Sequence, residues 1–171
     1  MVKAEADAVR VPVSLHLDHC ESYEGVCAAL EAARLGLEVV LIQNRPVLGG
    51  NNSSEIRVHL GGVIELGPNE GLGRMIREFG HSRQGNARLA ENYEDAKKSA
   101  FIAGEQNVKL FSSCRAVAVN KEGGRIKSVI VRHIETGEET TLEAPLFADC
   151  TGDGTVGFLA GADYRMGRES R

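Results

Sequence analysis

Glycines and small polar residues at two places have the spacing of ligand-binding turns. The segment Gly152-Asp153-Gly154-Thr155-Val156-Gly157 has the pattern G-x-G-x-x-G, directly after an expected strand and at the start of an expected helix. Unpaired N–H groups at a helix start favour anions, and glycines let a ligand approach the backbone. The Asp153 carboxylate could accept hydrogen bonds from a sugar-like hydroxyl. The alternative is an ordinary strand-to-helix turn in which Asp153 caps the helix.

The second candidate turn is the segment LGGNNSSE, residues 48–55. Gly49 and Gly50 are followed by four small polar side chains, a composition that can wrap a polar ligand. The same composition is also typical of a solvated loop.

The elements before the second turn have the pattern of a βαβ unit. Residues 11–17 alternate between apolar and other residues, which predicts a strand. Apolar residues then recur at helical spacing over 22–35, with Gly36 as the stop signal. Residues 38–42 are an apolar run of strand length. This order favours a parallel strand pair, as in nucleotide-binding α/β folds.

The rest of the chain adds helices and more strands. Helices are expected near 71–79 and over 88–104, the latter ending at Gly104. Several short strands joined by glycine-containing turns predict a β-meander: VKLFSS, RAVAVN, RIKSVIVRHI and ETTLEA. A final buried strand is expected at 146–150, directly before the polar turn that begins at Gly152.

Composition limits the functions that this chain can have. With 171 residues, 42% of them apolar, and a net charge of −4, it has the features of one globular domain and is a poor nucleic-acid binder. It has no apolar run long enough to cross a membrane and no signal peptide, so we expect a cytoplasmic protein. Its scattered cysteines are expected to be reduced. Glycine contributes 20 residues, well above the average of about 7%.

Two long segments resemble the FAD-dependent oxidoreductases: ALEAARLGLEVVLIQNRPVLGGNNSSEIRVHLGG and LFADCTGDGTVGFLAGADYRMGRE. These are two-dinucleotide-binding-domain flavoproteins related to glutathione reductase and the succinate dehydrogenase flavoprotein, and the resemblance covers about residues 25–169. It implies an α/β fold, a Rossmann-like domain with a parallel sheet, flanking helices and a β-meander. It also implies FAD as cofactor and a redox reaction on a small-molecule substrate, with the catalytic residues unknown.

The resemblance further implies which residues bind FAD. The first phosphate loop ends at Gly25, the adenosine ribose meets Gln43, and the adenine lies near Ala116 and Val117. Other segments follow the pyrophosphate and ribityl chain. The full expected set is Gly25, Gln43, Asn44, Arg45, Gly49, Gly50, Asn51, Ala116, Val117, Thr151, Gly152, Asp153 and Gly154.

The first phosphate loop departs from the family pattern. The family has G-x-G-x-x-G there, but alignment through Gly25 places its first two glycines on Cys20 and Ser22. Those glycines allow the tight turn and leave room for the pyrophosphate. Side chains at both positions crowd the anion, and Glu21 and Glu24 add repulsive charge. We therefore expect FAD affinity to be strongly reduced or abolished.

The start of the chain resembles a different family. Residues 11–23, VPVSLHLDHCESY, are similar to the metal-site strand of class II fructose-bisphosphate aldolases. That resemblance implies His19 as a zinc ligand and Asp18 as the proton-transfer acid, and His16 and Cys20 could also bind a metal. It covers only about a dozen residues, without counterparts of the later ligands, in a chain too short for a barrel of about 250 residues. The structural alternative has Asp18 and His19 capping the turn.

The two resemblances meet near Gly25, which suggests a chimera. We expect a single FAD-binding-type domain over 1–171, with an atypical segment at 1–24 and no C-terminal substrate domain. Such a chain is expected to be inactive alone and to self-associate through the face that the substrate domain would cover. The alternatives are a zinc-dependent aldolase-like lyase fragment and a folded fragment that binds neither ligand.

Overall fold

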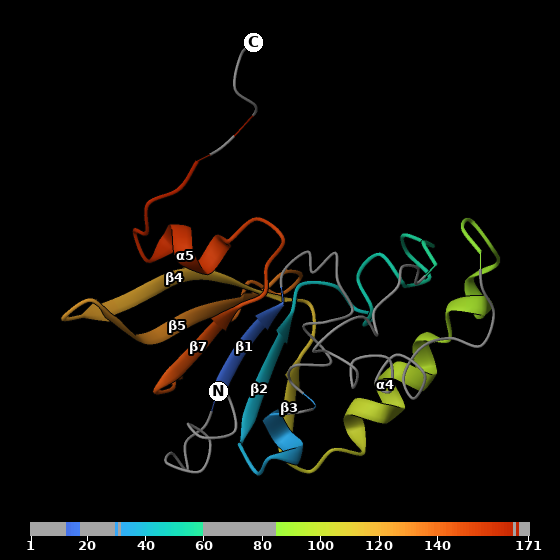
Figure 1. The fold of residues 1–171 in the computed structure, drawn as a ribbon, viewed down its shortest axis with the longest axis horizontal. Coiled ribbons are helices and arrows are strands. Elements are labelled where there is room, and N and C mark those ends of the chain that lie inside the picture. The colour runs from blue at the N-terminus through green and yellow to red at the C-terminus, as the bar shows by residue number, and fades with distance from the viewer. Residues whose placement is uncertain (1–12, 18–29, 31, 60–84, 166, 168–171) are drawn as a thin grey trace, which may run out of the picture.

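The computed structural model describes residues 13–17, 30, 32–59, 85–165 and 167. In this part of the chain, four parallel strands form one sheet in the order β3-β2-β1-β7 (Figure 1). These strands are β1 (Val13–Leu17), β2 (Val39–Gln43), β3 (Val108–Phe111) and β7 (Leu146–Asp149). A second, antiparallel sheet has the order β4-β5-β6, from β4 (Cys114–Glu122), β5 (Arg125–His133) and β6 (Glu139–Glu143).

The predicted helix stop at Gly36 is confirmed. Leu30 and residues 32–34 are helical, and Gly36 has a φ of +87°. The Gly36 N–H donates to the Ala33 oxygen at 3.0 Å, and the Leu37 N–H donates to the Ala32 oxygen at 3.1 Å. These two bonds form a Schellman motif, which ends a helix with a left-handed residue. Residues 22–29 of the expected helix lie outside the described residues, as does the helix expected near 71–79.

Strand β2 divides the interior into two cores because its successive side chains point to opposite faces. Val39 and Leu41 pack in a cluster that includes Leu30 and Ile102. Ile42 packs in the other cluster, which includes residues of the antiparallel sheet such as Val129. Figure 1 shows helix α4 (Asp95–Ala103) on one side of the parallel sheet, and the antiparallel sheet and helix α5 (Thr155–Leu159) on the other. The fold is therefore the three-layer, Rossmann-like α/β fold that the sequence predicts.

The antiparallel sheet is the predicted meander. Glu122 pairs with Arg125, so the β4–β5 turn consists of Gly123 and Gly124. Both glycines have positive φ angles, +56° and +79°. Two consecutive positive φ angles are typical of a type I′ hairpin turn, which explains the Gly-Gly pair at this position.

Two strand predictions were wrong in detail. VKLFSS does not belong to the meander, because β3 pairs in parallel with β2, Val108 opposite Val39. Helix α4 precedes β3 and returns the chain to the start of the sheet, and a crossover of this kind produces a parallel strand. Strand β7 is not fully buried: it pairs with β1 at one edge of the described sheet, and Leu146 is 47% exposed.

The helix predicted over 88–104 is interrupted. A 3₁₀ helix, η1 (Ala90–Tyr93), precedes α4, and Glu94 between them has a φ of +49°. An α-helix does not continue through a left-handed residue, so the two segments are separate. The predicted end at Gly104 is confirmed. None of the helices in the described residues is both long and apolar enough to cross a membrane.

Candidate functional site

The strand order places a topological switch point between β1 and β7. The chain passes from β1 to β2 and then to β3, whereas β7 pairs with β1 on its other side. Leu17 is level with Gln43, and His16 with Asp149, so the segments that follow β2 and β7 leave the same edge of the sheet. Ligands of open α/β sheets bind outside the carboxyl ends of the strands at such a point. Both polar turns identified in the sequence therefore lie at the binding edge.

The segment after β2, residues 44–58, forms a tightly curled loop that we call the glycine loop. Gln43 lies just before it and is 3% exposed, and its amide Nε2 donates to the Val47 oxygen at 3.1 Å. Gly49 and Gly50 have φ angles of +116° and +55°. The Ser53 hydroxyl donates to the Gly50 oxygen at 2.7 Å. Side chains of the loop and of β2 thus satisfy backbone groups of the loop itself.

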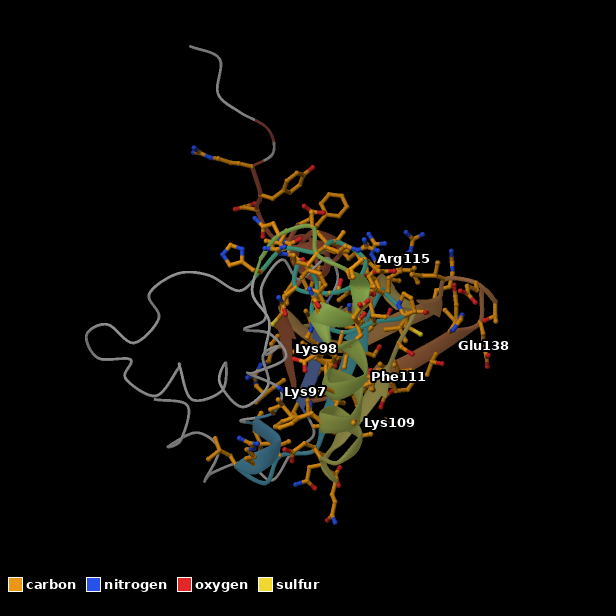
Figure 2. The ribbon with its side chains drawn as sticks, turned by 90° about the vertical axis from the view of Figure 1, so that its right-hand side faces the viewer. Lys97, Lys98, Lys109, Phe111, Arg115 and Glu138 are labelled. Atoms are coloured by element: carbon orange, nitrogen blue, oxygen red, sulfur yellow. The ribbon has the colours of Figure 1, made fainter. Side chains whose placement is uncertain are left out.

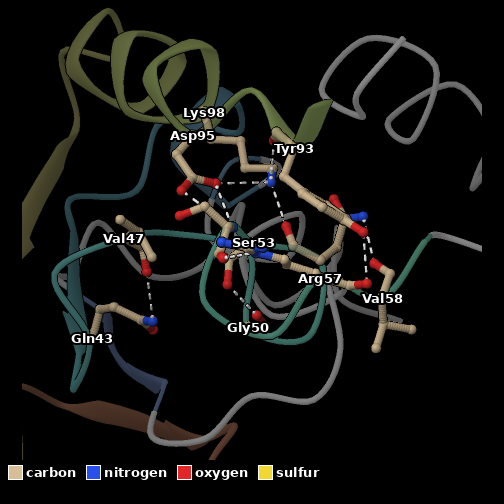
Figure 3. A network of polar contacts seen from close by, with 11 residues as sticks. Gln43, Val47, Gly50, Ser53, Arg57, Val58, Tyr93, Asp95 and Lys98 are labelled. Carbon is tan, nitrogen blue, oxygen red and sulfur yellow. Dashed lines mark hydrogen bonds and ion pairs between the residues drawn. The ribbon is translucent and has the colours of Figure 1, made fainter. Parts of the chain in front are cut away.

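A buried ammonium group, that of Lys98, donates hydrogen bonds to the backbone of the glycine loop and to Tyr93. Lys97 and Lys98 are adjacent on α4, Lys97 exposed and Lys98 fully buried (Figure 2). The Lys98 Nζ donates to the main-chain oxygens of Asn52 and Tyr93, the latter at 2.7 Å, and lies 3.6 Å from Asp95 Oδ1 (Figure 3). Burial lowers the pKa of Lys98, and the neighbouring Asp95 carboxylate opposes this effect.

Lys98 also explains one of the two loop glycines. A Cβ on Gly49 would stand 2.9 Å from Lys98 Nζ and closer still to the main-chain oxygen of Asn52. The positive φ of Gly49 would strain any other residue as well. The close approach that the sequence suggests for this glycine is therefore, in this structure, an approach to the chain's own ammonium group.

Two further contacts fix the same loop. The Ser54 N–H lies 3.2 Å from both carboxylate oxygens of Asp95. The buried Tyr93 hydroxyl donates to the Arg57 oxygen at 2.6 Å and lies 2.9 Å from the Gly85 oxygen. The loop is therefore attached through its backbone to η1 and α4 at three points (Figure 3).

One buried polar atom of the loop has no partner. The Asn52 side chain is buried, and its Nδ2 donates to the Val58 oxygen at 3.0 Å. Its Oδ1 is the one buried side-chain oxygen or nitrogen in the described residues that accepts or donates no hydrogen bond. Buried acceptors are normally satisfied, so an orphaned one indicates a missing donor.

The turn after β7 is capped by residues other than Asp153. Asp149 Oδ1 accepts the Thr151 N–H and hydroxyl at 3.0 and 2.6 Å. The Thr151 hydroxyl oxygen accepts the Thr155 N–H at 2.6 Å, and Asp149 Oδ2 accepts the Gly157 N–H at 2.8 Å. The alternative in which Asp153 caps the helix is therefore wrong. Two N–H groups at the start of α5 that we expected to be open to an anion are already bonded.

An open hollow of about 900 Å³ adjoins this turn. The exposed Asp153 lies at its wall, and Gly154 beside it has a φ of +64° with no atom within 4 Å of a Cβ added there. Its aromatic wall is formed by Phe158 and Tyr164, whose rings meet edge to face at 5.1 Å. The hollow has a volume in the range of ligand pockets. Its lining consists of Asp149, Gly152, Asp153, Gly154, Thr155, Gly157, Phe158, Ala162, Asp163, Tyr164, Arg165 and Gly167.

A smaller hollow of about 270 Å³ lies where β2 and β3 end. Asn44 and Arg45 line it, and the Ser113 N–H donates to the Arg45 oxygen at 3.3 Å, which joins the two strand ends. Ala116 is buried in the adjacent core, and Val117 is half-buried on β4. Of the residues expected at the adenosine, Asn44 and Arg45 therefore line this hollow, Ala116 and Val117 are not among its lining residues, and Gln43 is buried.

Several predicted site residues lie outside the described residues. They are Gly25 of the phosphate loop, with Cys20 and Ser22 at its altered positions, and the aldolase-like Asp18 and His19. Within the described part of the chain, no three His, Cys, Asp or Glu residues are grouped so that they could hold a metal ion. The aldolase-like resemblance and the chimera stay predictions.

Sequence reasoning missed Lys98, Asp95 and Asp149, and it included Asn52 only as one of the four small polar residues after Gly49 and Gly50. One signal was present: Lys98 lies four residues before the buried Ile102, a position on the apolar side of α4. A lysine at such a position needs buried acceptors. The Asp95–Lys98 spacing of three residues also indicates an ion pair on one helix face. No signal identified Asn52 as the acceptor, because it is 46 residues away in the chain.

The parallel sheet, its three layers and the polar turns at the switch point define a dinucleotide-binding domain of the Rossmann type. The model of the family described as FAD dependent oxidoreductase matches residues 22–171. This chain belongs to the FAD dependent oxidoreductase family, and FAD is its cofactor. The resemblance that the sequence shows over about 25–169 is confirmed.

Two solved structures share the fold, with TM-scores of 0.50 and 0.55, and a third has a lower score. Glycerol-3-phosphate dehydrogenase from Bacillus halodurans complexed with FAD is 10% identical, with a TM-score of 0.55, over 92% of this chain and 38% of that one. A geranylgeranyl bacteriochlorophyll reductase-like protein from Thermoplasma acidophilum is 20% identical, with a TM-score of 0.50, over 88% of this chain and 42% of that one. Thioredoxin reductase from Lactococcus lactis is 13% identical, with a TM-score of 0.48, over 87% of this chain and 34% of that one.

The chain therefore spans between about a third and two fifths of the length of these three proteins. No curated protein matches it in sequence.

Proposed function

We propose that this chain binds FAD across the carboxyl ends of β1, β2 and β7, as the cofactor domain of an oxidoreductase that acts on a small organic molecule. The observation that carries the proposal is the switch point between β1 and β7, with one polar turn on each side of it. When bound, FAD would accept or donate the electrons of the reaction. The chain's own residues bind and orient the cofactor.

The unpartnered Asn52 Oδ1 supports a ligand at the glycine loop. A carboxamide oxygen accepts hydrogen bonds, so it fits a hydroxyl or N–H group of the cofactor rather than a phosphate. Gly50 and Asn51 are half-buried at the same loop and complete its expected contact surface. The residues present here fit the proposed cofactor.

The turn after β7 fits hydroxyl groups better than a phosphate group. The N–H groups of Thr155 and Gly157 already donate hydrogen bonds within the turn, so they are not available to bind an anion. The exposed carboxylate of Asp153 repels a phosphate and accepts hydroxyl hydrogen bonds. We therefore assign the ribityl hydroxyls to Asp153, with Thr151, Gly152 and Gly154 forming the turn around it.

The adenosine half of FAD is assigned to the smaller hollow. Asn44 and Arg45 line that hollow, together with Ser113, which directly precedes the strand that carries Ala116 and Val117. Gln43 is buried and bonded to Val47, so its proposed part is to shape the loop beneath the ribose. The pyrophosphate is left to the loop that ends at Gly25.

Cys20 and Ser22 reduce the affinity for FAD in this proposal. They stand where the family has the glycines that leave room for the pyrophosphate, and Glu21 and Glu24 add negative charge beside it. The loss of affinity comes from the pyrophosphate contacts alone, because the residues assigned to the ribityl chain and to adenosine are retained. We therefore propose a weakened FAD site rather than an abolished one.

We further propose that residues 22–171, which match the family, form one FAD-binding-type domain. Self-association through the apolar residues around the larger hollow, such as the exposed Phe158 and Tyr164, belongs to the same proposal.

A titration of the purified chain with FAD, followed by quenching of flavin fluorescence, tests the function. We expect saturable binding with a Kd of about 10–100 μM, that is, a free energy near −6 kcal/mol. Binding that fails to saturate at about 1 mM FAD would contradict the cofactor role. A Kd below about 1 μM would contradict the proposed weakening. Asp153→Ala is the test variant, and Asp163→Ala, which removes another carboxylate from the lining of the same hollow, is its control.

A further inference from the structure

The ion pair between the buried Lys98 and the half-buried Asp95 has no part in the cofactor contacts assigned above. We propose that these two residues are positioning residues for FAD: they hold the glycine loop in the conformation that presents Gly50 and Asn52 to the cofactor. This inference rests on the proposed function for its ligand, but not for the loop contacts themselves.

Lys98 and Asp95 form hydrogen bonds to the loop backbone on both sides of Ser53. The Lys98 ammonium donates to the carbonyl oxygen of Asn52, and the Asp95 carboxylate accepts the N–H of Ser54. Ser53 between them is fully buried, and its hydroxyl bonds back to the Gly50 oxygen. Hydrogen bonds to charged partners are stronger than neutral ones, so this three-residue stretch is fixed on α4 (Figure 3).

The same contacts fix the direction of the Asn52 side chain. Lys98 holds its carbonyl oxygen and Val58 accepts its Nδ2 hydrogen, so the remaining oxygen, Oδ1, has little freedom to turn. This is the buried atom without a partner in the described residues. A preorganised acceptor of this kind binds with a smaller loss of conformational entropy. The function of Lys98 and Asp95 in this proposal is thus to fix the orientation of the Asn52 side-chain oxygen.

General stability alone is a weak reason for a charged pair at this position. Buried ion pairs add little over apolar residues of the same size, and Ile102, one turn along α4, packs in the core without such partners. The two charges differ from an apolar pair in that they specify where the loop backbone lies. Gly49 adds to this, because only a residue without a Cβ leaves room for the ammonium group.

The test compares Lys98→Met with two matched variants on the same helix. Lys97→Met removes the neighbouring exposed lysine. Ile102→Val weakens the core cluster that Ile102 shares with Leu48 of the loop, but it removes no hydrogen bond to the loop. Amide hydrogen exchange, measured by NMR without FAD, reports the loop through Asn52, Ser54, Arg57 and Val58. FAD affinity is measured on the same samples.

We expect Lys98→Met to speed exchange of these four amides at least tenfold and to raise the Kd for FAD at least tenfold. Both control variants should stay within twofold in the loop and in affinity. Asp95→Asn, which keeps an acceptor for Ser54, should change the same amides by a smaller factor. It serves as the test variant if Lys98→Met does not fold.

Two results would overturn the proposal. One is unchanged loop exchange in Lys98→Met, or in Asp95→Asn where that variant stands in. The other is an equal loss of FAD affinity in Ile102→Val, which would make the effect one of general stability. If the unaltered chain binds no FAD, the proposed function fails, and the exchange measurement still decides whether the pair holds the loop.

Discussion

Replacing Gly49 by alanine tests the observed reason for a glycine at the centre of the site. The alanine Cβ would meet the Asn52 oxygen and would stand 2.9 Å from the Lys98 ammonium. Neither group can move freely, because Lys98 is fully buried and bonded to two carbonyl oxygens. The chain must therefore strain its backbone, shift the loop, or break a buried charged hydrogen bond.

The expected cost is large compared with that of an ordinary positive-φ glycine. A non-glycine residue at positive φ costs roughly 1–2 kcal/mol. Losing one hydrogen bond to a charged group adds about 1.5–3 kcal/mol. We therefore expect Gly49→Ala to lower the free energy of unfolding by about 3–5 kcal/mol, a large part of the 5–15 kcal/mol typical of a domain. Gly36→Ala is the matched control, because Gly36 also has a positive φ but no atom within 4 Å of an added Cβ.

Urea unfolding followed by far-ultraviolet circular dichroism measures both variants, since the chain has no Trp for fluorescence. Gly36→Ala should lose about 1–2 kcal/mol, and Gly49→Ala about 2–3 kcal/mol more. Equal losses in the two variants would refute the reasoning. They would mean that the close approach of Lys98 to Gly49 does not determine the residue at that position.

Four further predictions follow from the same contacts and from the altered phosphate loop. The double change Cys20→Gly with Ser22→Gly should lower the Kd for FAD at least tenfold by titration, and an unchanged Kd would contradict the role assigned to these side chains. Asp153→Ala should raise the Kd for FAD about tenfold while the free energy of unfolding changes by less than about 0.5 kcal/mol, because Asp153 is exposed and caps nothing. Thr151→Val should instead lower that free energy by about 1–2 kcal/mol in urea unfolding, because it removes the hydroxyl that accepts the Thr155 N–H; no loss would count against the cap. Burial raises the pKa of Cys114, so its reactive thiolate is disfavoured near pH 8; peptide mapping should find its alkylation by iodoacetamide at least tenfold slower in the folded chain than in urea, and equal rates would count against its burial.

The parts of the fold that could be predicted depend on neighbours in the chain. The helix stop at Gly36 and the Gly123-Gly124 turn each need only a few residues to form, so local patterns identified them. The three-layer fold followed from the order of such elements. Strand β3 was misplaced because its short apolar pattern is the same in a meander as in a parallel sheet, and its pairing with β2 joins residues far apart in sequence.

The site shows the same division between local and distant causes. The two polar turns could be located from their glycines. The side chains that form hydrogen bonds to the backbone of these turns could not be predicted. Lys98 reaches Asn52 across 46 residues, and a lysine in a helix is usually solvated. Asp149 and Thr151 cap α5 through a turn whose G-x-G-x-x-G pattern pointed instead to Asp153. Patterns of residue type show where a ligand can approach, but three-dimensional contacts decide which groups stay free for it.

Mapping FAD onto the chain by NMR tests the central claim, that the cofactor binds at the switch point between β1 and β7. We predict that amide shifts induced by about 1 mM FAD concentrate in Gly49–Ser54 and Gly152–Gly157, and that the β4–β5 hairpin around Gly123 and Gly124 stays unchanged. Shifts confined to other surfaces, or none at that concentration, would contradict the account.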